Sequence, residues 1–279
     1  MNNTELVEWV RDARQRTMDL VADLSDEQLF GPRIAIINPL RWEIGHVAWF
    51  QEKWVLRGAA QQPPIRSDGD ALYDSAAIPH DTRWDLPLPS REQTLAYMSA
   101  VRDGVIERIE SGKASDGERY FILLSVFHED MHTEAFTYTR QTLGYPPPVF
   151  SAAASPASTQ QEAGALAGDA EIPGGRFLLG AQPGEPFVFD NEQWAHAVEV
   201  KPFAMARAAV SQSEFAAFVE ERGYARRELW SEAGWQWREG AGAEHPPYWK
   251  REAGGRWLRK DFNRWLPLEP YRPVLHVNW

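Results

Sequence analysis

The stretch Phe127-His128-Glu129-Asp130-Met131-His132-Thr133-Glu134 lies in an apolar run, residues 120–143, that contains no glycine or proline. Its two histidines are four residues apart, so on a helix their rings lie on one face, about one turn apart. Two imidazoles in that arrangement can hold one metal ion in the core of a helix bundle. The spacing also occurs where both histidines are hydrogen-bonded or exposed. The neighbouring apolar residues favour burial, and buried neutral imidazoles need partners.

The residues before this run predict three more long helices. Apolar spacing predicts a helix over residues 4–24, and a capping pattern from Ser25 predicts a short turn after it. Asn38 as N-cap with a following proline starts the next helix, which Gly58 ends. A capping box at Ser90 starts a helix to about residue 109, and Asp116 is expected to cap the helix of the histidine pair. Four long helices with one crossover loop predict a four-helix bundle.

His46 is the candidate for a third metal ligand. It sits beside the apolar stripe of the helix that starts near residue 38. A lone histidine there is commonly bonded to a backbone carbonyl, but beside the histidine pair it would complete a three-imidazole face with open positions. The tryptophans and the phenylalanine around it are mostly expected to be core residues.

The crossover loop, residues 61–89, carries two further candidates. Long loops with polar and aromatic residues often line active sites. We expect Arg83 to bind an anionic group of a substrate, since arginine grips carboxylates bidentately. A surface salt bridge is the alternative. His80 could compete as a metal ligand, but its place after a proline favours a hydrogen-bonding role.

Composition narrows the classes of function. The net charge is −11 and the pI is near 5.2, which disfavours nucleic-acid binding and leaves small molecules as the expected partners. The chain has no cysteine, so any metal must use His, Asp or Glu. No stretch approaches the roughly 18 apolar residues of a membrane span, and no signal-peptide pattern opens the chain. We therefore expect a soluble cytoplasmic protein without a membrane partner.

A second kind of sequence follows Gly144. Residues 151–170 are rich in Ala, Ser, Pro and Gln and predict a flexible linker. Short strands with glycine turns are expected over residues 172–180, 197–200 and 203–205. A helix from Ser211 to Arg222 should follow, with Gly223 after its end. Beyond it the periodicity fails. The chain is thus expected to be α+β, with a bundle at 1–150, a linker at 151–170 and a second domain at 171–279.

Several motifs resemble one enzyme family. Gly45-His46-Val47-Ala48-Trp49-Phe50 and His128-Glu129-Asp130-Met131-His132 resemble the DinB-like bundle of the ergothioneine-type sulfoxide synthases. The second half resembles their formylglycine-generating-enzyme-like (C-type-lectin-like) domain. The motifs there are Ile172-Pro173-Gly174-Gly175, Phe189-Asp190-Asn191-Glu192 with His196, and Gly223-Tyr224. The closing residues 273–279 match a strand that precedes a further stretch in relatives, so we expect this domain to be truncated at its C-terminus.

The resemblance implies oxidative chemistry on hercynine. It makes His46, His128 and His132 the ligands of a nonheme Fe(II). The implied reaction uses dioxygen to join sulfur or selenium to the imidazole C2 carbon. Iron is needed for its redox step, whereas zinc could only polarise its ligands. No catalytic acid is assigned, because the family's tyrosine lies in the stretch that has no counterpart here. We also expect tryptophans of the second domain to help hold the trimethylammonium of hercynine.

Two features favour the selenoneine synthase branch of the family. Asp130 and Met131 stand where ergothioneine synthases commonly carry glutamines, and residues 72–89 resemble the selenoneine branch. The sequence interpretation therefore favours a selenosugar donor, with a thiol donor, gamma-glutamylcysteine or cysteine, as the alternative. Two other classes stay open: a DinB-like metal-dependent thiol transferase and a non-enzymatic lectin-like binding protein. Formylglycine-generating activity is disfavoured because that chemistry uses cysteines.

Overall fold

The computed structural model describes residues 1–151 and 166–277, so residues 152–165 of the predicted linker lie outside the described residues. The chain forms two compact units. Of the described residues, 1–151 and 180–194 form one unit, and 166–179 and 195–277 form the other. Strand β1 begins at Asp169, so the last two residues of the predicted linker belong to a strand.

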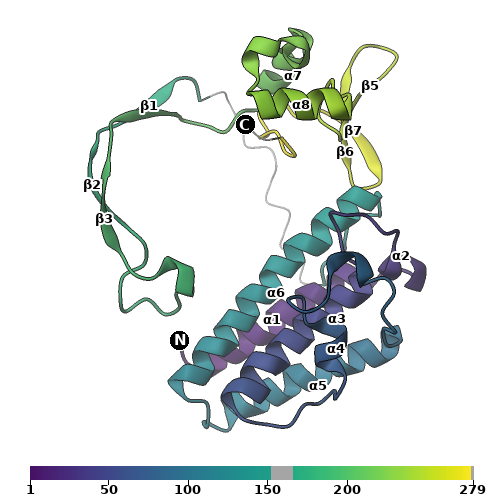
Figure 1. Cartoon of the computed structure of the whole chain (residues 1–279), viewed down its shortest axis with the longest axis vertical. Coiled ribbons are helices and arrows are strands. Elements are labelled where there is room, and N and C mark those ends of the chain that lie inside the picture. The colour runs from purple at the N-terminus through teal and green to yellow at the C-terminus, as the bar shows by residue number, and fades with distance from the viewer. Residues whose placement is uncertain (152–165, 278–279) are drawn as a thin grey trace. The chain divides into compact units, whose positions relative to one another are not determined.

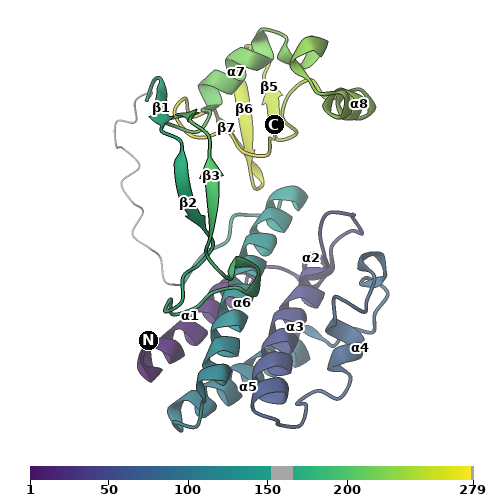
Figure 2. The ribbon, with the colours of Figure 1, turned by 60° about the vertical axis from the view of Figure 1, so that its left-hand side comes forward.

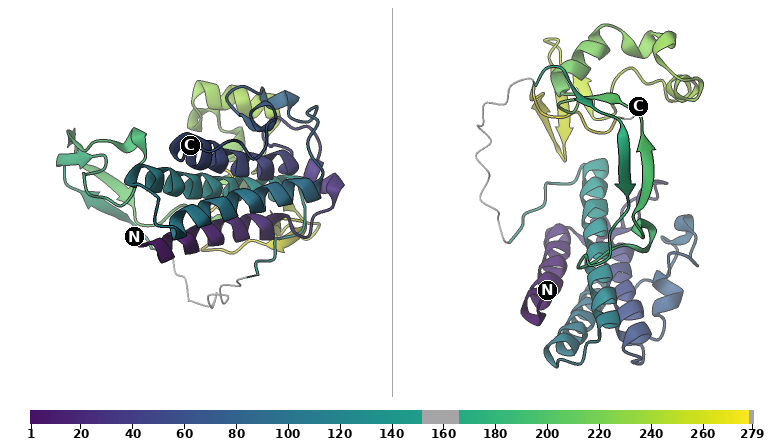
Figure 3. Two further views of the ribbon diagram at one scale, coloured as in Figure 1. Left: turned by 90° about the horizontal axis from the view of Figure 1, so that it is seen from below. Right: turned by 90° about the vertical axis from the view of Figure 1, so that its left-hand side faces the viewer.

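Four long helices form the first unit (Figure 1). They are α1 (Asn3–Val21), α3 (Leu40–Gln51), α5 (Arg91–Glu110) and α6 (Asp116–Leu143). Helices α1 and α3 each pack against both α5 and α6, which closes a four-helix arrangement. Figure 3 shows these helices lengthwise, lying side by side. The predicted bundle is therefore confirmed. In the described part of the chain, no helix combines the length and apolarity that crossing a membrane requires.

The helix starts follow capping chemistry, with two corrections. The side chains of Ser90 and Ser115 each accept a hydrogen bond from the backbone N–H three residues on. The side chain of that third residue, Gln93 or Glu118, accepts in turn from the backbone N–H of the serine. Ser115, not Asp116, is thus the cap of α6. The N-cap of α3 is Pro39 and not Asn38. The side chain of Asn38 does not cap the helix because its Oδ1 accepts a hydrogen bond from Arg83.

The helix that begins as α3 does not stay α-helical to its end. From Glu52 to Ala59 the backbone forms a π-helix, labelled η1, where the sequence predicted continuous α-helix. Glu52 is fully buried there and accepts hydrogen bonds from the Ile65 amide and the Tyr97 hydroxyl. Buried groups of this kind need partners, and π-helical turns are frequent near functional sites.

The short helix α2 (Asp26–Phe30) precedes α3. The crossover between α3 and α5 carries the short helix α4 (Gly69–Tyr73) and the single turn η2 (His80–Thr82). Tyr73 of this crossover packs against α3 at Gly45. A Cβ atom on Gly45 would lie 2.3 Å from the ring of Tyr73. Glycine is therefore required at the position just before His46 for the buried Tyr73 to pack against α3.

A polar network crosses the apolar core. The Arg14 guanidinium of α1 donates to both carboxylate oxygens of Glu129, at 2.8 and 3.1 Å, and to the Met98 carbonyl at 2.6 Å. It also donates to Gln51, which in turn bonds Ser125. The charged groups of Arg14 and Glu129 are almost fully buried. The network therefore ties all four long helices together.

Residues 180–194 associate with the bundle unit, although they follow the second domain's first strands in sequence. Phe187 stacks on Tyr120 at 5.1 Å between ring centroids and contacts Phe127 at 4.8 Å. Phe189 adds a second contact to Phe127. Aromatic pairs at these distances stabilise beyond the area that they bury. This segment thus covers the face of α6 just before His128.

The second unit combines short antiparallel strands and two helices (Figure 2). The strands are β1 (Asp169–Ile172), β2 (Gly175–Leu179), β3 (His196–Val200), β4 (Phe203–Ala206), β5 (Trp249–Arg251), β6 (Trp257–Asp261) and β7 (Arg264–Pro267). They pair as β1–β4, β2–β3 and β5–β6–β7. The helices are α7 (Gln212–Glu220) and α8 (Glu232–Ala241), with the single turns η4 (Gly223–Ala225) and η5 (Arg227–Leu229). The turn η3 (Asp190–Glu192) lies in the segment 180–194 and so belongs to the first unit.

Two features of this unit differ from the sequence expectations. The residue after α7 with left-handed backbone is Arg222, at φ +62°, and not Gly223. Gly223 is instead required because a Cβ atom there would lie 2.2 Å from the Phe218 ring. Helix α8 and the sheet β5–β7 lie in the region whose pattern predicted no regular structure, because their apolar residues follow no single period.

We predict that Arg14→Met lowers the free energy of unfolding by about 3–5 kcal/mol, because it leaves the Glu129 carboxylate buried and unpaired. Urea denaturation followed by circular dichroism measures this. The double variant Arg14→Met/Glu129→Leu is the control and should recover much of the loss, since it removes both charges. Equal losses in the two variants would show that the ion pair itself is not responsible.

Candidate metal centre

Three histidines converge in the bundle. His46 comes from α3, and His128 and His132 come from α6. One ring nitrogen from each lies within 4.8 Å of the other two. The ring centroids are 4.6 to 5.1 Å apart. The structure thus brings together the three residues that the sequence singled out, at a separation that one shared ion could bridge.

Hydrogen bonds orient two of the three rings. Nδ1 of His46 lies 2.8 Å from the Tyr73 carbonyl oxygen, which can only accept, so this nitrogen carries the proton. Nδ1 of His132 lies 2.9 Å from Glu43 Oε1 and donates to that carboxylate in the same way. A neutral imidazole protonated on Nδ1 keeps the lone pair on Nε2. Both rings therefore present Nε2 as a metal donor.

His128 is held differently. Its ring stacks on Phe50 with centroids 3.7 Å apart and planes 11° apart. Its Nδ1 is buried and has no hydrogen-bond partner among the described residues. Leaving such an atom unpaired costs free energy, about 1–3 kcal/mol for a typical buried group. An ion or hydrogen-bonding group bound at this nitrogen would offset that cost, which is the behaviour expected of a metal-binding residue.

The site favours neutral imidazoles. Burial lowers the pKa of His46 to about 3, and burial also lowers the pKa of His128 to about 2, with the neighbouring histidines adding to both shifts. Since their folded pKa values lie below the unfolded value near 6.5, the stability they contribute is present above that pH and is lost as the pH falls. Around neutral pH both rings have free lone pairs, which metal coordination requires.

Glu43 is the site residue that sequence reasoning missed. Its carboxylate is 2% exposed, and Oε2 has no hydrogen-bond partner among the described residues. It lies three residues before His46 on α3, so both side chains point to one face of the helix. The Glu-x-x-His spacing, which recurs in metal-binding bundles, could have revealed it. A carboxylate behind an imidazole fixes the ring and raises its basicity.

An aromatic wall flanks His46. Trp42 stacks on the His46 ring with centroids 4.7 Å apart, and Trp49 lies 5.6 Å from it. The Arg83 guanidinium lies over the Trp42 ring at 4.1 Å and donates to Asn38 Oδ1 at 2.7 Å. Arg83 forms no carboxylate salt bridge within the described residues, so the surface salt bridge weighed from the sequence is absent there.

His80 and the acidic residues beside the histidine pair do not belong to the cluster. His80 bonds the Ile37 carbonyl at 2.6 Å, which matches the hydrogen-bonding role expected of it. Glu129 is occupied by Arg14, and Glu134 is exposed. Asp130 pairs with Arg16 of α1 at 2.8 Å. None of these four completes the histidine cluster.

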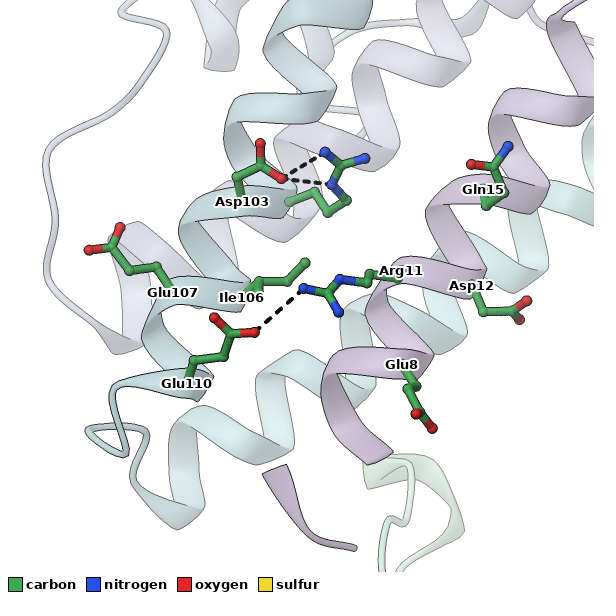
Figure 4. Close-up of a pocket in the computed structure, with 9 residues that line it drawn as sticks. Glu8, Arg11, Asp12, Gln15, Asp103, Ile106, Glu107 and Glu110 are labelled. Carbon is green, nitrogen blue, oxygen red and sulfur yellow. Dashed lines mark hydrogen bonds and ion pairs between the residues drawn. The ribbon is translucent and has the colours of Figure 1, made fainter. Parts of the chain in front are cut away.

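A groove of about 790 Å³ lies elsewhere on the bundle, between α1 and α5 (Figure 4). Acidic residues dominate it, and Arg11 pairs with Glu110 across it at 3.4 Å. It contains none of the three histidines. The groove is therefore unrelated to the metal centre.

The donor set fits a transition metal. Three neutral nitrogen donors suit iron, zinc, copper or nickel, and three ligands leave further positions open. The unpartnered Nδ1 of His128 and the buried negative charge of Glu43 both fit a cation at this point.

Fold and site together define a two-domain protein with a three-histidine centre in its helical domain. Residues 10–138 match the model of the DinB superfamily, and residues 154–279 match that of the sulfatase-modifying factor enzyme 1-like domain. The expected α+β class, with a DinB-type bundle followed by a formylglycine-generating-enzyme-like domain, is confirmed.

The chain is also related to hercynine oxygenases. It is 31% identical over 281 residues to the hercynine oxygenase of Mycolicibacterium thermoresistibile, covering 100% of this chain and 61% of that protein. It is 31% identical over 270 residues to the hercynine oxygenase of Mycobacterium tuberculosis, covering 96% and 62%. A formylglycine-generating enzyme of Streptomyces coelicolor is 31% identical over 137 residues, 46% of this chain and 41% of that enzyme. The chain thus spans about three fifths of the hercynine oxygenases it matches.

We predict that Glu43→Gln weakens the binding of a divalent metal ion, for which iron is the probe, by about 10- to 100-fold, because an amide orients the His132 ring less firmly and does not raise its basicity. Competition with a chelator measures the affinity. Glu134→Gln makes the same charge change at an exposed position of α6 and should bind iron like the wild type. Equal affinity in both variants would contradict the role given to Glu43.

Proposed function

We propose that this chain carries the metal centre of a hercynine oxygenase that binds Fe(II). The observation that carries the proposal is the convergence of His46, His128 and His132, with ring nitrogens within 4.8 Å, in a chain related to hercynine oxygenases along its whole length. When bound, ferrous iron would supply the redox chemistry that activates dioxygen and that a zinc ion cannot supply.

The proposed reaction joins a thiol to the imidazole C2 of hercynine. The C2–H and S–H bonds break, and a C–S bond and an S–O bond form. Dioxygen accepts four electrons and ends as the sulfoxide oxygen and one water. This balance needs no further reductant, so iron, hercynine, a thiol such as gamma-glutamylcysteine or cysteine, and dioxygen are the required partners.

The residues of the chain have two roles in this proposal. His46, His128 and His132 hold the ion. Glu43 and the Tyr73 carbonyl fix two of the rings through their Nδ1 protons. Three protein ligands would leave positions on a bound ion for the substrates.

We favour a thiol as the donor in this reaction, although the sequence analysis favoured a selenosugar. One of the residues behind that preference, Asp130, pairs with Arg16 of α1. The relatives are named for the oxygenation of hercynine, and their names carry no mention of selenium. The crossover residues 72–89 still support the selenoneine reading, so selenium is kept as the second candidate.

We predict that the chain, loaded anaerobically with Fe(II) and hercynine, forms a hercynine sulfoxide adduct after air is admitted in the presence of gamma-glutamylcysteine or cysteine. Mass spectrometry with each thiol and with a selenosugar in separate reactions identifies the donor. Zinc-loaded protein is the control and should form nothing, because zinc has no redox step. Product from the selenosugar alone would restore the selenium reading, and identical zinc and iron reactions would overturn the proposal.

Arg83 is proposed to bind an anionic group of the sulfur donor. Its guanidinium extends over Trp42, whose ring stacks on His46, so it lies one ring away from a metal ligand. Two of its contacts, to the Ser75 and Ile78 carbonyls, are long at 3.4 Å. Hydrogen bonds of that length are weak, which leaves donor capacity for a carboxylate.

We predict that Arg83→Lys weakens binding of the thiol donor to the iron-loaded protein by about 10-fold, because a lysine keeps the charge but loses the bidentate grip. Calorimetry measures the affinity, and hercynine affinity serves as the internal comparison. If Arg83→Lys changes the affinity for neither the thiol donor nor hercynine but lowers the melting temperature, the role of Arg83 is only structural. It then stabilises the crossover loop through its hydrogen bond to Asn38.

A further inference from the structure

The second unit contains a cavity of about 470 Å³ that the proposed function does not use. It lies among the end of α7, the turn η4, the helix α8 and the strands β5 and β6. Its lining includes the cationic side chains of Arg222, Arg238 and Arg251, together with the ring of Trp257. A volume of this size is typical of small-molecule sites.

Positive charge is concentrated in this cavity, although the chain carries a net charge of −11. Arg251 pairs with Glu220 at 3.5 Å. Within the described ranges, Arg222 and Arg238 take part in no ion pair. Glu244 is the acidic residue among those that line the cavity, so the balance favours an anionic occupant.

Two buried donors of the lining lack acceptors. Arg238 Nε and Trp257 Nε1 are inaccessible to solvent and have no hydrogen-bond partner in the described part of the chain. Both can only donate. Each unpaired donor costs free energy. Both residues line the cavity, so an oxyanion that displaced the neighbouring side chains and accepted from both atoms would remove that cost.

The backbone at Arg222 adds a separate observation. This residue has φ +62°, in the left-handed region that favours glycine. Holding a non-glycine residue there costs about 1 kcal/mol or more. A long cationic side chain is thus kept at the cavity rim at a position where its backbone is strained, and such outliers gather at ligand sites.

We propose that this cavity binds a small organic oxyanion, a carboxylate or phosphate group carried on an aromatic body. Arg222, Arg238 and the Trp257 indole N–H would hold the oxyanion. The rings of Trp257 and Tyr224 would contact the body, since aromatic faces stack on one another. No residue of the histidine centre takes part, so the proposal stands independently of the iron chemistry.

The test follows the Trp257 indole N–H in the nitrogen-15 NMR spectrum of the full chain. The signal is assigned by its absence in Trp257→Phe. Inorganic phosphate and benzoate are titrated separately, so that an oxyanion alone is compared with one on an aromatic ring. We expect a saturable shift of this one indole signal, with tighter binding of benzoate because its ring adds stacking.

Arg238→Met should weaken the binding of the preferred probe by about 10-fold or more, since a charge-assisted hydrogen bond is lost. Arg207→Met makes the same charge change at an exposed position outside the cavity and should leave the affinity unchanged. Calorimetry measures both. Tighter binding of phosphate than of benzoate would assign the site to a phosphate-bearing ligand without a stacked ring, and would remove the aromatic body from the proposal.

Trp257→Phe separates a ligand role from a structural one, because it removes the donor and keeps most of the ring. For a ligand role, the melting temperature is retained while anion affinity falls. The proposal is overturned if neither probe shifts the Trp257 signal at millimolar concentration, or if Arg238→Met and Arg207→Met bind equally. A lower melting temperature in Trp257→Phe with unchanged affinity would also overturn it.

Discussion

The hydrogen bond from His132 Nδ1 to the buried Glu43 carboxylate is the interaction on which the metal centre depends. It joins α6 to α3, it sets which nitrogen of His132 faces the cluster, and it places a carboxylate beside the three imidazoles. An isolated buried carboxylate is costly, and Oε2 of Glu43 has no partner among the described residues. A bound cation would compensate that charge, so the same carboxylate that orients the ring also favours metal binding.

The rest of the bundle keeps this interaction in place. The Arg14–Glu129 pair ties α1 to α6 one residue away from His128, and Gln51 and Ser125 extend that network between α3 and α6. Gly45 lets Tyr73 approach α3, and the Tyr73 carbonyl then holds His46. Two of the three rings are thus oriented by groups from other elements of the fold, and His128 by stacking on Phe50. This gives a preorganised site, which binds a metal without first paying to order its ligands.

The sequence predicted the parts of this site that follow from helical periodicity. The spacing of His128 and His132 and the apolar stripe beside His46 were enough to bring three rings to one place. Glu43 was missed although its spacing from His46 carries a signal. The Tyr73 carbonyl could not be foreseen, because a backbone atom from a long loop leaves no pattern in the side chains. The π-helix after Gln51 and the helix α8 were missed for a related reason. The π-helix contains buried polar contacts, and α8 contains scattered tryptophans, and neither feature is periodic in the sequence.

The central claim is that three histidines bind one ferrous ion, and stoichiometric iron loading tests it most directly. Wild-type protein, His128→Ala and His80→Ala are each titrated anaerobically with Fe(II), desalted and assayed for iron per chain. His80 bonds a backbone carbonyl away from the cluster, so its replacement controls for loss of a histidine. The account predicts one iron per chain in the wild type and in His80→Ala, and almost none in His128→Ala. Full iron retention in His128→Ala would contradict it.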